Sequence, residues 1–428
     1  MSNPRLISPS HRREQGQTIV LVALALVTLL AMAALAIDVV TLYVARSEMQ
    51  RAADAAALAG AKAFVDSGVT TDPTNTNLQT LAQDMANATI SSIVQQNKIA
   101  GAPPVLASPP AFSFTNAGNP TLSVTLQRTD LPTFFARIWG SRLATVTASA
   151  TAEAYNPSNW QTSTGISVAP KCVKPLLIPN KDPGRPLGTT FVSATTGTVT
   201  LPGIYPAGVI GETFGVPPIP ELSDACPPGN PNNPCVNSDP PAGTFIPASV
   251  PLDPTKELCP SCAGSSDLEQ GIECCDFRPS SYSCGGTIPV DISTTSKNVR
   301  RDADNGVQCL INASGSGLGQ GQDSLDPANF LAGSGPMQIT ANSGPLNGRL
   351  VLTSNSITTF PIIDTPITGG QATVVGFLQA FVNYENGTGS STQVNLTILN
   401  VAGCGNTAGT TVISGGGVSP VPVRLIHQ

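Results

Sequence analysis

An unbroken apolar run from Ile19 to Ile37 limits what this chain can fold into more than any other stretch does. Its nineteen residues carry no charge, and Thr28 is the only polar one. A helix of about 20 apolar residues crosses a hydrocarbon core about 30 Å thick. A buried core helix usually keeps a polar face, and the apolar part of a secretory signal is shorter, at about 7–15 residues. The run therefore predicts a transmembrane helix, with a cleaved signal peptide as the alternative.

The charged flanks of the run predict its orientation. Arg5, Arg12 and Arg13 precede it, and Arg46 and Arg51 follow it more distantly. Because positively charged flanks stay in the cytoplasm, we expect a single-pass protein of the cytoplasmic (inner) membrane with its amino terminus inside. The bulk of the chain is then periplasmic or extracellular.

The helix is expected to continue beyond the membrane. No proline lies between Asp38 and Phe64, and alanine, the best helix former, is frequent there. This predicts one rod of about 45 residues. Ala52, Ala56 and Gly60 recur at four-residue spacing, and such rows of small residues let another backbone approach closely. We interpret the row as a helix-packing face for a partner helix. The alternative is that alanine is present only because it favours helix.

The same segment resembles a known family. Gly16 precedes the apolar run, Asp38 closes it, and Gln50 is followed by the alanine-rich block at residues 52–59. In this order and spacing, these features resemble the amino-terminal domain of the Tad pilus-assembly proteins, especially the TadG-like group. A strand, Pro132, two phenylalanines and a second strand extend the resemblance to about residue 156. It implies an inner-membrane component of the machine that builds Flp-type pili.

One departure from the pilins related to that family concerns processing. Pilins cut by prepilin peptidase typically carry glutamate five residues after the cleavage glycine, and here Leu21 stands five residues after Gly16. The resemblance therefore implies an uncleaved, permanently anchored protein. A processed minor pilin is the alternative.

Composition excludes some classes of protein. Only 11% of the 428 residues are charged, the net charge is −6 and no basic run occurs, which argues against nucleic acid as a partner. With 40 glycines, 39 prolines and 5% aromatic residues, the chain is typical of a loop-rich extracytoplasmic protein that has a modest core.

The ten cysteines all lie beyond residue 170, in the part predicted to be outside the cytoplasm. Disulfides persist in such compartments, so all ten are disulfide candidates: Cys172, Cys226, Cys235, Cys259, Cys262, Cys274, Cys275, Cys284, Cys309 and Cys404. The pairing is not fixed by sequence. A neighbour such as Cys309 is expected for Cys404, which follows a strand. Zinc bound between Cys259 and Cys284 is an alternative, but no histidine is near and the spacing is irregular.

Hydrophobic periodicity divides the rest of the chain. Apolar residues between Leu78 and Ile99 recur at helical spacing, whereas alternation around Leu122–Leu126 and in Ala144–Tyr155 predicts strands. Three β-branched and aromatic runs after residue 348 predict a sheet. The expected fold class is α+β, with a long amino-terminal transmembrane helix, a small pilin-like α+β domain and a disulfide-braced β-rich carboxy-terminal region. We expect five divisions. They are a cytoplasmic tail (1–17), the transmembrane helix (18–40), the Tad-type extracytoplasmic domain (41–156), a Pro/Gly/Cys-rich irregular region (157–290) and a β-rich carboxy-terminal domain (291–428).

Two acidic strings resemble cation sites. Asp291–Thr295 has the DxSxS pattern of von Willebrand A domains, but the strand before it is short and broken by proline. Asp302–Gly306 resembles the start of an EF-hand whose glycine is one position early, so we expect a plain turn there. Neither string predicts a metal site.

No constellation for catalysis is evident. The two histidines, His11 and His427, lie near opposite ends of the sequence, which disfavours a Ser/His/Asp or Cys/His assembly. We therefore expect a non-enzymatic protein without cofactor, catalytic residues or metal, whose partners are the membrane and, through the amino-terminal helix, other pilus-assembly proteins. The leading hypothesis is a structural assembly component of a Tad pilus system. A membrane-tethered binding module or adhesin is the second.

Overall fold

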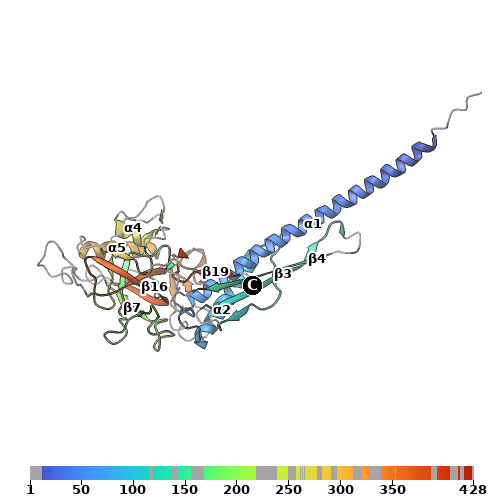
Figure 1. Ribbon diagram of the computed structural model, residues 1–428. Coiled ribbons are helices and arrows are strands. Elements are labelled where there is room, and N and C mark those ends of the chain that lie inside the picture. Colours follow the sequence, from blue (N-terminus) through green and yellow to red (C-terminus); the bar gives the residue numbers. More distant parts are fainter. Residues whose placement is uncertain are drawn as a thin grey trace, which may run out of the picture. The chain divides into compact units, whose positions relative to one another are not determined.

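A computed structural model gives the fold of the chain (Figure 1). It describes residues 12–115, 119–136, 140, 143–155, 168–217, 239–248, 257–260, 262, 264, 266–276, 282–290, 296–311, 321–326, 339–351, 353–386, 393–404, 413–414 and 419–426. The chain divides into two compact units. Unit 1 comprises 1–53, 94–109 and 124–149, and unit 2 comprises 54–93, 110–123 and 150–428.

Helix α1, Arg12–Asp66, is one uninterrupted helix of 55 residues (Figure 1). At 1.5 Å per residue it is about 80 Å long. It ends where Gly68 takes a left-handed backbone with φ of 73°, a conformation that glycine adopts without steric cost. The amides of Ser67 and Gly68 donate to the carbonyls of Ala63 and Val65, which closes the last turn. The predicted continuation of the apolar helix into an outer rod is confirmed.

The next elements form a small sheet in the order β1-β3-β4-β19, with β2 also paired to β3. Their bounds are β1 Val105–Leu106, β2 Ala111–Ser113, β3 Thr121–Pro132, β4 Leu143–Ala154 and β19 Val423–Ile426. Buried and partly buried residues alternate along the first eight residues of β3, as the period of two predicts. In unit 1, the Arg128 side chain donates to the carbonyls of Ile99 and Ala102 and holds that connection beside β3.

In unit 2, helix α2, Thr76–Gln96, packs with the last turns of α1. Asn75 begins α2, because its side-chain oxygen accepts from the amides of Asn77 and Leu78. The core here includes Phe64, which lies edge-on to Phe112 with the ring centroids 6.1 Å apart. The amphipathic helix predicted between Leu78 and Ile99 is confirmed.

A seven-stranded sheet dominates unit 2, in the order β7-β17-β16-β15-β6-β8, with β11 paired to β16. The bounds are β6 Leu176–Pro179, β7 Thr213–Val216, β8 Ile246–Pro247, β11 Thr287–Pro289, β15 Ile357–Ile363, β16 Gln371–Asn386 and β17 Gln393–Gly403. Strands β15, β16 and β17 form an antiparallel meander, and β6 runs parallel to β15. The three runs predicted as strands after residue 348 are confirmed as β14 with β15, β16 and β17.

Shorter elements complete unit 2. They are β5 Val168–Ala169 with β18 Ile413–Ser414, β9 Glu257–Leu258 with β10 Cys275–Asp276, and the sheet β12 Asp323–Leu325, β13 Ile339–Ala341 and β14 Leu350–Val351. A 3₁₀ turn spans Gly344–Leu346, and helices α4, Asp267–Glu273, and α5, Ser296–Leu310, contact each other (Figure 1).

The acidic string at 302–306 is corrected by the structure. It lies inside α5 and is neither a turn nor a calcium loop. Gly306 faces α4, because a Cβ built on it would stand 3.0 Å from Ile272 Cβ. The glycine therefore permits close approach of two helices. The string at 291–295 lies outside the described residues.

The end of α1 is bonded to the seven-stranded sheet within unit 2. The Asn400 amide on β17 donates to the carbonyl of Val65 and to the Thr70 hydroxyl, both at 2.8 Å. The Gln379 amide on β16 donates to Asp66 at 3.1 Å. All five groups are buried or nearly so, and a buried bond costs free energy to leave unmade. The carboxy-terminal sheet thus closes the end of the amino-terminal helix.

The α+β class with a long apolar helix and a disulfide-bonded, β-rich remainder is confirmed. The finer division at 156 and 290 stays a prediction. Strands from 157–290 (β6, β7, β8 and β11) join the same sheet as strands from 291–428 (β15, β16 and β17).

Replacing Gly60 tests how tightly α1 packs in unit 2. A Cβ on Gly60 would lie 2.8 Å from Leu122 and 3.0 Å from Ile90, so Gly60→Leu overpacks this core. We expect a loss of about 1–3 kcal/mol in unfolding free energy, measured by thermal unfolding in detergent. Ala55→Leu, on the exposed side of the same helix, is the control and should change the melting temperature little. An unchanged melting temperature for Gly60→Leu would contradict this packing.

Candidate functional site

The amino-terminal half of α1 exposes apolar side chains on all sides. From Ile19 to Val44 most are about half exposed or more, for example Leu29 at 67% and Met32 at 70%. The helix is long and apolar enough to cross a membrane, with a mean hydropathy of 2.9 in its most apolar window and none of that window buried. Exposure of this extent is unfavourable in water but suits a lipid environment. The helix is therefore suited to single-pass membrane anchoring.

Asp38 lies at the end of this apolar half and is buried within unit 1. Its carboxylate accepts three backbone hydrogen bonds, from the amides of Phe134, Phe135 and Ala136, at 2.8, 3.0 and 2.6 Å. A buried carboxylate is costly unless it is hydrogen-bonded, and these three amides supply the hydrogen bonds. One side chain of α1 thus fixes the turn that follows β3. The sequence singled out Asp38 only through the family resemblance and indicated no role for it.

The row of small residues on α1 is used differently from the prediction. Ala52, Ala56 and Gly60 are buried in the chain itself, with Ala52 at 1% and Ala56 at 0% exposure. Gly60 lies against Ile90 of α2 and Leu122 of β3. The expectation of a row left open to a partner helix is corrected, because all three residues are buried in the chain and Gly60 packs against the chain's own α2 and β3. Sequence spacing shows that a backbone comes close but not whose backbone it is.

Eight of the ten cysteine candidates are described, and each has a cysteine partner. The disulfides are Cys172–Cys275, Cys259–Cys274, Cys262–Cys309 and Cys284–Cys404. The expectation that Cys404 pairs with Cys309 is wrong, because the turn before β11 places Cys284 beside the end of β17. Cys226 and Cys235 lie outside the described residues. Among the described residues no group of three or more histidine, cysteine or acidic side chains is placed to hold a metal.

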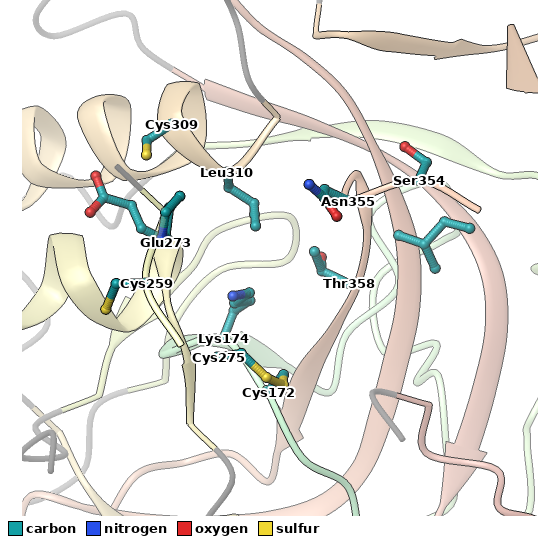
Figure 2. A pocket seen from close by; sticks show the side chains of 12 residues that line it. Cys172, Lys174, Cys259, Glu273, Cys275, Cys309, Leu310, Ser354, Asn355 and Thr358 are labelled. Carbon is teal, nitrogen blue, oxygen red and sulfur yellow. A yellow bond between two sulfur atoms is a disulfide. The ribbon is translucent and has the colours of Figure 1, made fainter. Parts of the chain in front are cut away.

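Three of these disulfides border a pocket of about 480 Å³ in unit 2 (Figure 2). Lys174, just before β6, and Glu273, the last residue of α4, both line it. Both are about 95% buried, although they are charged residue types. The Lys174 amine donates to the carbonyl of Cys274 at 2.8 Å, and Glu273 accepts from the amide of Gly264 at 2.6 Å.

Burial changes the acid–base behaviour of this pair. Desolvation lowers the pKa of Lys174 to about 7, and the nearby Glu273 carboxylate opposes that shift. Desolvation also raises the pKa of Glu273 to about 7, against the Gly264 hydrogen bond and Lys174, while Glu269 adds to the rise. The two groups therefore titrate in the same range, and neutral forms of both are populated near pH 7.

Sequence reasoning missed this pair. Lys174 lies within an apolar stretch two residues after Cys172, and Glu273 directly precedes Cys274 and Cys275. A charged residue close to a cysteine is the signal that was available. It was too weak alone, because the 98 residues between Lys174 and Glu273 hide that both line one pocket.

These features define an α+β protein with one exposed apolar helix suited to anchoring and a disulfide-bonded, β-rich remainder. Residues 16–63 match the Tad family, described as "Putative Flp pilus-assembly TadE/G-like". The matched residues lie within α1, where the predicted resemblance begins, and the resemblance is thereby confirmed for these residues. Its extension to about residue 156 stays a prediction. The chain matches no curated protein and no solved structure.

Removing the Asp38 carboxylate should loosen the turn after β3. With Asp38→Ala, three backbone amides lose their acceptor, which lowers the local stability of the turn. We expect hydrogen exchange of the amides of Phe134–Ala136 to become about 5- to 150-fold faster, measured by mass spectrometry in detergent. Thr41→Val is the control, since the Thr41 hydroxyl donates to the carbonyl of Asp38 within the helix. Unchanged exchange in Asp38→Ala would contradict the contact.

Glu273 and Lys174 should change the unfolding free energy with pH in opposite directions. The pKa of Glu273 is about 7 in the folded protein, against its ordinary value of 4.5. The stability that the protonated Glu273 contributes to the fold is therefore present below pH 4.5 and is lost as pH rises to 7. The pKa of Lys174 is about 7 in the folded protein, against its ordinary value of 10.5. The stability that the neutral Lys174 contributes to the fold is therefore present above pH 10.5 and is lost as pH falls to 7. Both contributions are therefore smallest near pH 7.

Two substitutions separate these contributions. The gain in unfolding free energy from Glu273→Gln, relative to the parent protein, should grow between pH 4.5 and 7. The gain from Lys174→Met should shrink between pH 7 and 10.5. Thermal unfolding of the detergent-solubilised protein at about pH 5, 7 and 9 measures both differences. Differences that do not change with pH would show that these groups titrate normally in the fold.

Proposed function

We propose that this chain is a membrane-anchored, non-catalytic structural component of the machinery that assembles Flp-type pili. The match of residues 16–63 to the Tad family supports the pilus context. The apolar half of α1 supports the anchor. The anchor lies in the inner membrane with its amino terminus in the cytoplasm, and that terminus is not processed after Gly16.

The proposed orientation of the chain across the membrane is supported by the charges that precede the apolar run and by the disulfides. The arginines at 12 and 13 favour a cytoplasmic start, and the four disulfides favour an oxidising compartment for residues 172–404. The bulk of the chain then lies in the periplasm or outside the cell.

The observation that carries the proposal is the division of α1 into two kinds of surface. From Met49 to Phe64 its small and apolar side chains are mostly buried in the chain, whereas from Ile19 to Val44 they are mostly exposed. The membrane half of α1 is therefore the part available to the helices of other pilus-assembly proteins. In lipid, association depends on close packing of shaped helix surfaces, because hydrophobicity alone does not drive it. The sequence of the span itself is then functional.

A tethered binding module is the second candidate, and the pocket lined by Lys174 and Glu273 favours it. In that case the span serves only as an anchor. The two candidates differ in what the residues from 19 to 37 must do.

Exchanging the span distinguishes the candidates. Residues 19–37 are replaced by a run of leucines of the same length, leaving Asp38 and its contacts in place, and pili are counted in cells that lack the native chain. The proposal expects normal membrane insertion and the loss of pilus export. Restoration of the native span is the positive control, and Ala55→Leu, on the exposed outer side of α1, is the matched substitution that should leave export intact. Normal pili with the leucine span would contradict the proposal and favour the tethered module.

A further inference from the structure

Helix α1 keeps exposing apolar side chains after the run that suffices to cross a membrane. The run ends at Ile37, and its nineteen residues, at about 1.5 Å each, already span a hydrocarbon core about 30 Å thick. Four apolar side chains of the next two turns are about half exposed or more: Val39, Val40, Tyr43 and Val44. These side chains therefore need a cover other than the hydrocarbon core.

The turn after β3 brings further apolar surface to the end of the run. The amides of Phe134, Phe135 and Ala136 donate to the carboxylate of Asp38, which directly follows Ile37. The turn is thereby fixed beside the end of the run. Phe134 is nevertheless 61% exposed. An aromatic side chain is thus left open where α1 leaves the hydrocarbon core.

Strand β4 runs beside α1 in the same direction (Figure 1). The Gln50 side-chain amide donates to the carbonyl of Ser149 at 3.1 Å, which fixes one point of the strand against the helix. Earlier in both elements, residues 145–147 of β4 line one groove with residues 39–46 of α1. Earlier residues of the strand thus lie beside earlier residues of the helix.

This alignment places the start of β4 at the end of the run. Leu143 precedes Ser149 by six residues, which is about 20 Å of strand. The same distance along α1 is about 13 residues and leads from Gln50 back to Ile37. Leu143 is 59% exposed. Helix, turn and strand of unit 1 therefore form one apolar patch close to the end of the run: Val39, Val40, Tyr43, Val44, Phe134 and Leu143.

The groove between α1 and β4 adds a positive charge to this patch. It has a volume of about 390 Å³, and Tyr43 and Arg46 both line it. Arg46 is the first basic residue after the run, nine residues past Ile37 or about 13 Å along α1. Side chains of a helix tilt toward its amino-terminal end, which here is the membrane side, and arginine is long enough to reach back to the interface.

Phospholipid fits the patch by position and by charge. The patch is continuous with the span of α1, and a headgroup layer about 5–8 Å thick lies directly beyond the hydrocarbon core. Tyrosine and other amphipathic aromatic residues favour this layer. Arg46 complements the negative phosphate of a lipid. A protein partner would have to compete with the headgroups that already surround the end of the span.

We propose that the apolar patch and Arg46 form a lipid-contact surface, which rests in the headgroup layer of the membrane that α1 spans. Phe134 and Leu143 dip toward the acyl chains, and Arg46 pairs with a lipid phosphate in the groove beside β4. The proposal rests on the membrane anchoring in the proposed function and goes beyond it. The hairpin of β3 and β4 then contacts the membrane as a second point of attachment.

Lipid photolabelling of the unmodified chain in phospholipid nanodiscs tests this contact. One probe lipid carries a diazirine on its headgroup, another carries it in the acyl chain, and peptide mass spectrometry locates the label. The headgroup probe should label residues 39–46, 134–136 and 143–147 at least about threefold more than the peptide that holds Val105. Val105 is the internal control. It is exposed in unit 1 but pairs with Gln127, seven residues before Phe134, and so lies about 20 Å along β3 from the turn.

The acyl-chain probe separates failure of this contact from failure of the anchor. It should label residues 19–37. Acyl-chain labelling of that span together with headgroup labelling of the patch no stronger than that of Val105 would overturn the lipid-contact surface and leave the anchor in place. Absence of acyl-chain labelling from 19–37 would overturn the anchoring and this proposal with it. Because the nanodisc holds a single purified chain, an unlabelled patch would indicate a protein partner instead.

A matched pair of arginine substitutions tests the phosphate contact. Arg46→Gln should lower the labelling of residues 39–46 by an anionic headgroup probe about fivefold, since one arginine near a lipid surface contributes about that factor. Arg51→Gln is the control, because Arg51 is also exposed on α1 but lies farther from the span. Both positions are exposed, so the fold should tolerate either change. Equal loss of labelling in both variants, or no loss in Arg46→Gln, would contradict the contact.

Discussion

The fold depends on one helix that meets two different environments along its length. The first part of α1 presents apolar side chains outward, and the last part presents small ones to the chain's own interior. Asp38 directly follows the apolar run Ile19–Ile37, and its three amide partners satisfy a charge that neither lipid nor a packed core would tolerate alone. At the far end, Asn400 and Gln379 bond the helix terminus to the carboxy-terminal sheet.

Much of this arrangement was predictable because periodicity reports local structure directly. The apolar run, the alternation in β3 and the β-branched runs of β15–β17 each indicate their secondary structure within a dozen residues or so. The string at 302–306 shows the limit of such reading. Its residues resemble a calcium loop, but tertiary packing against α4 places them in a helix, and only Gly306 carried a hint of that contact.

The sequence could not show which residues far apart in the chain contact one another. The small-residue row predicted close backbone approach correctly, yet the approaching elements, α2 and β3, belong to the same chain. Likewise, the cysteine count predicted disulfides, whereas the pairing of Cys284 with Cys404 depends on how β11 and β17 flank β16. Lys174, Glu273 and Thr358 line one pocket although they lie far apart in the sequence, so no local pattern could assemble them.

The Cys284–Cys404 disulfide also has a mechanical consequence. It spans 120 residues, and that stretch contains β15, β16 and β17. An extended chain covers about 3.5 Å per residue, so the residues between the two cysteines could extend by about 400 Å if they were pulled out. The disulfide prevents this extension when tension is applied to the two ends of the loop. A protein pulled between a membrane and a surface structure would then stay short, because the covalent bridge carries the load past the β15–β17 strands.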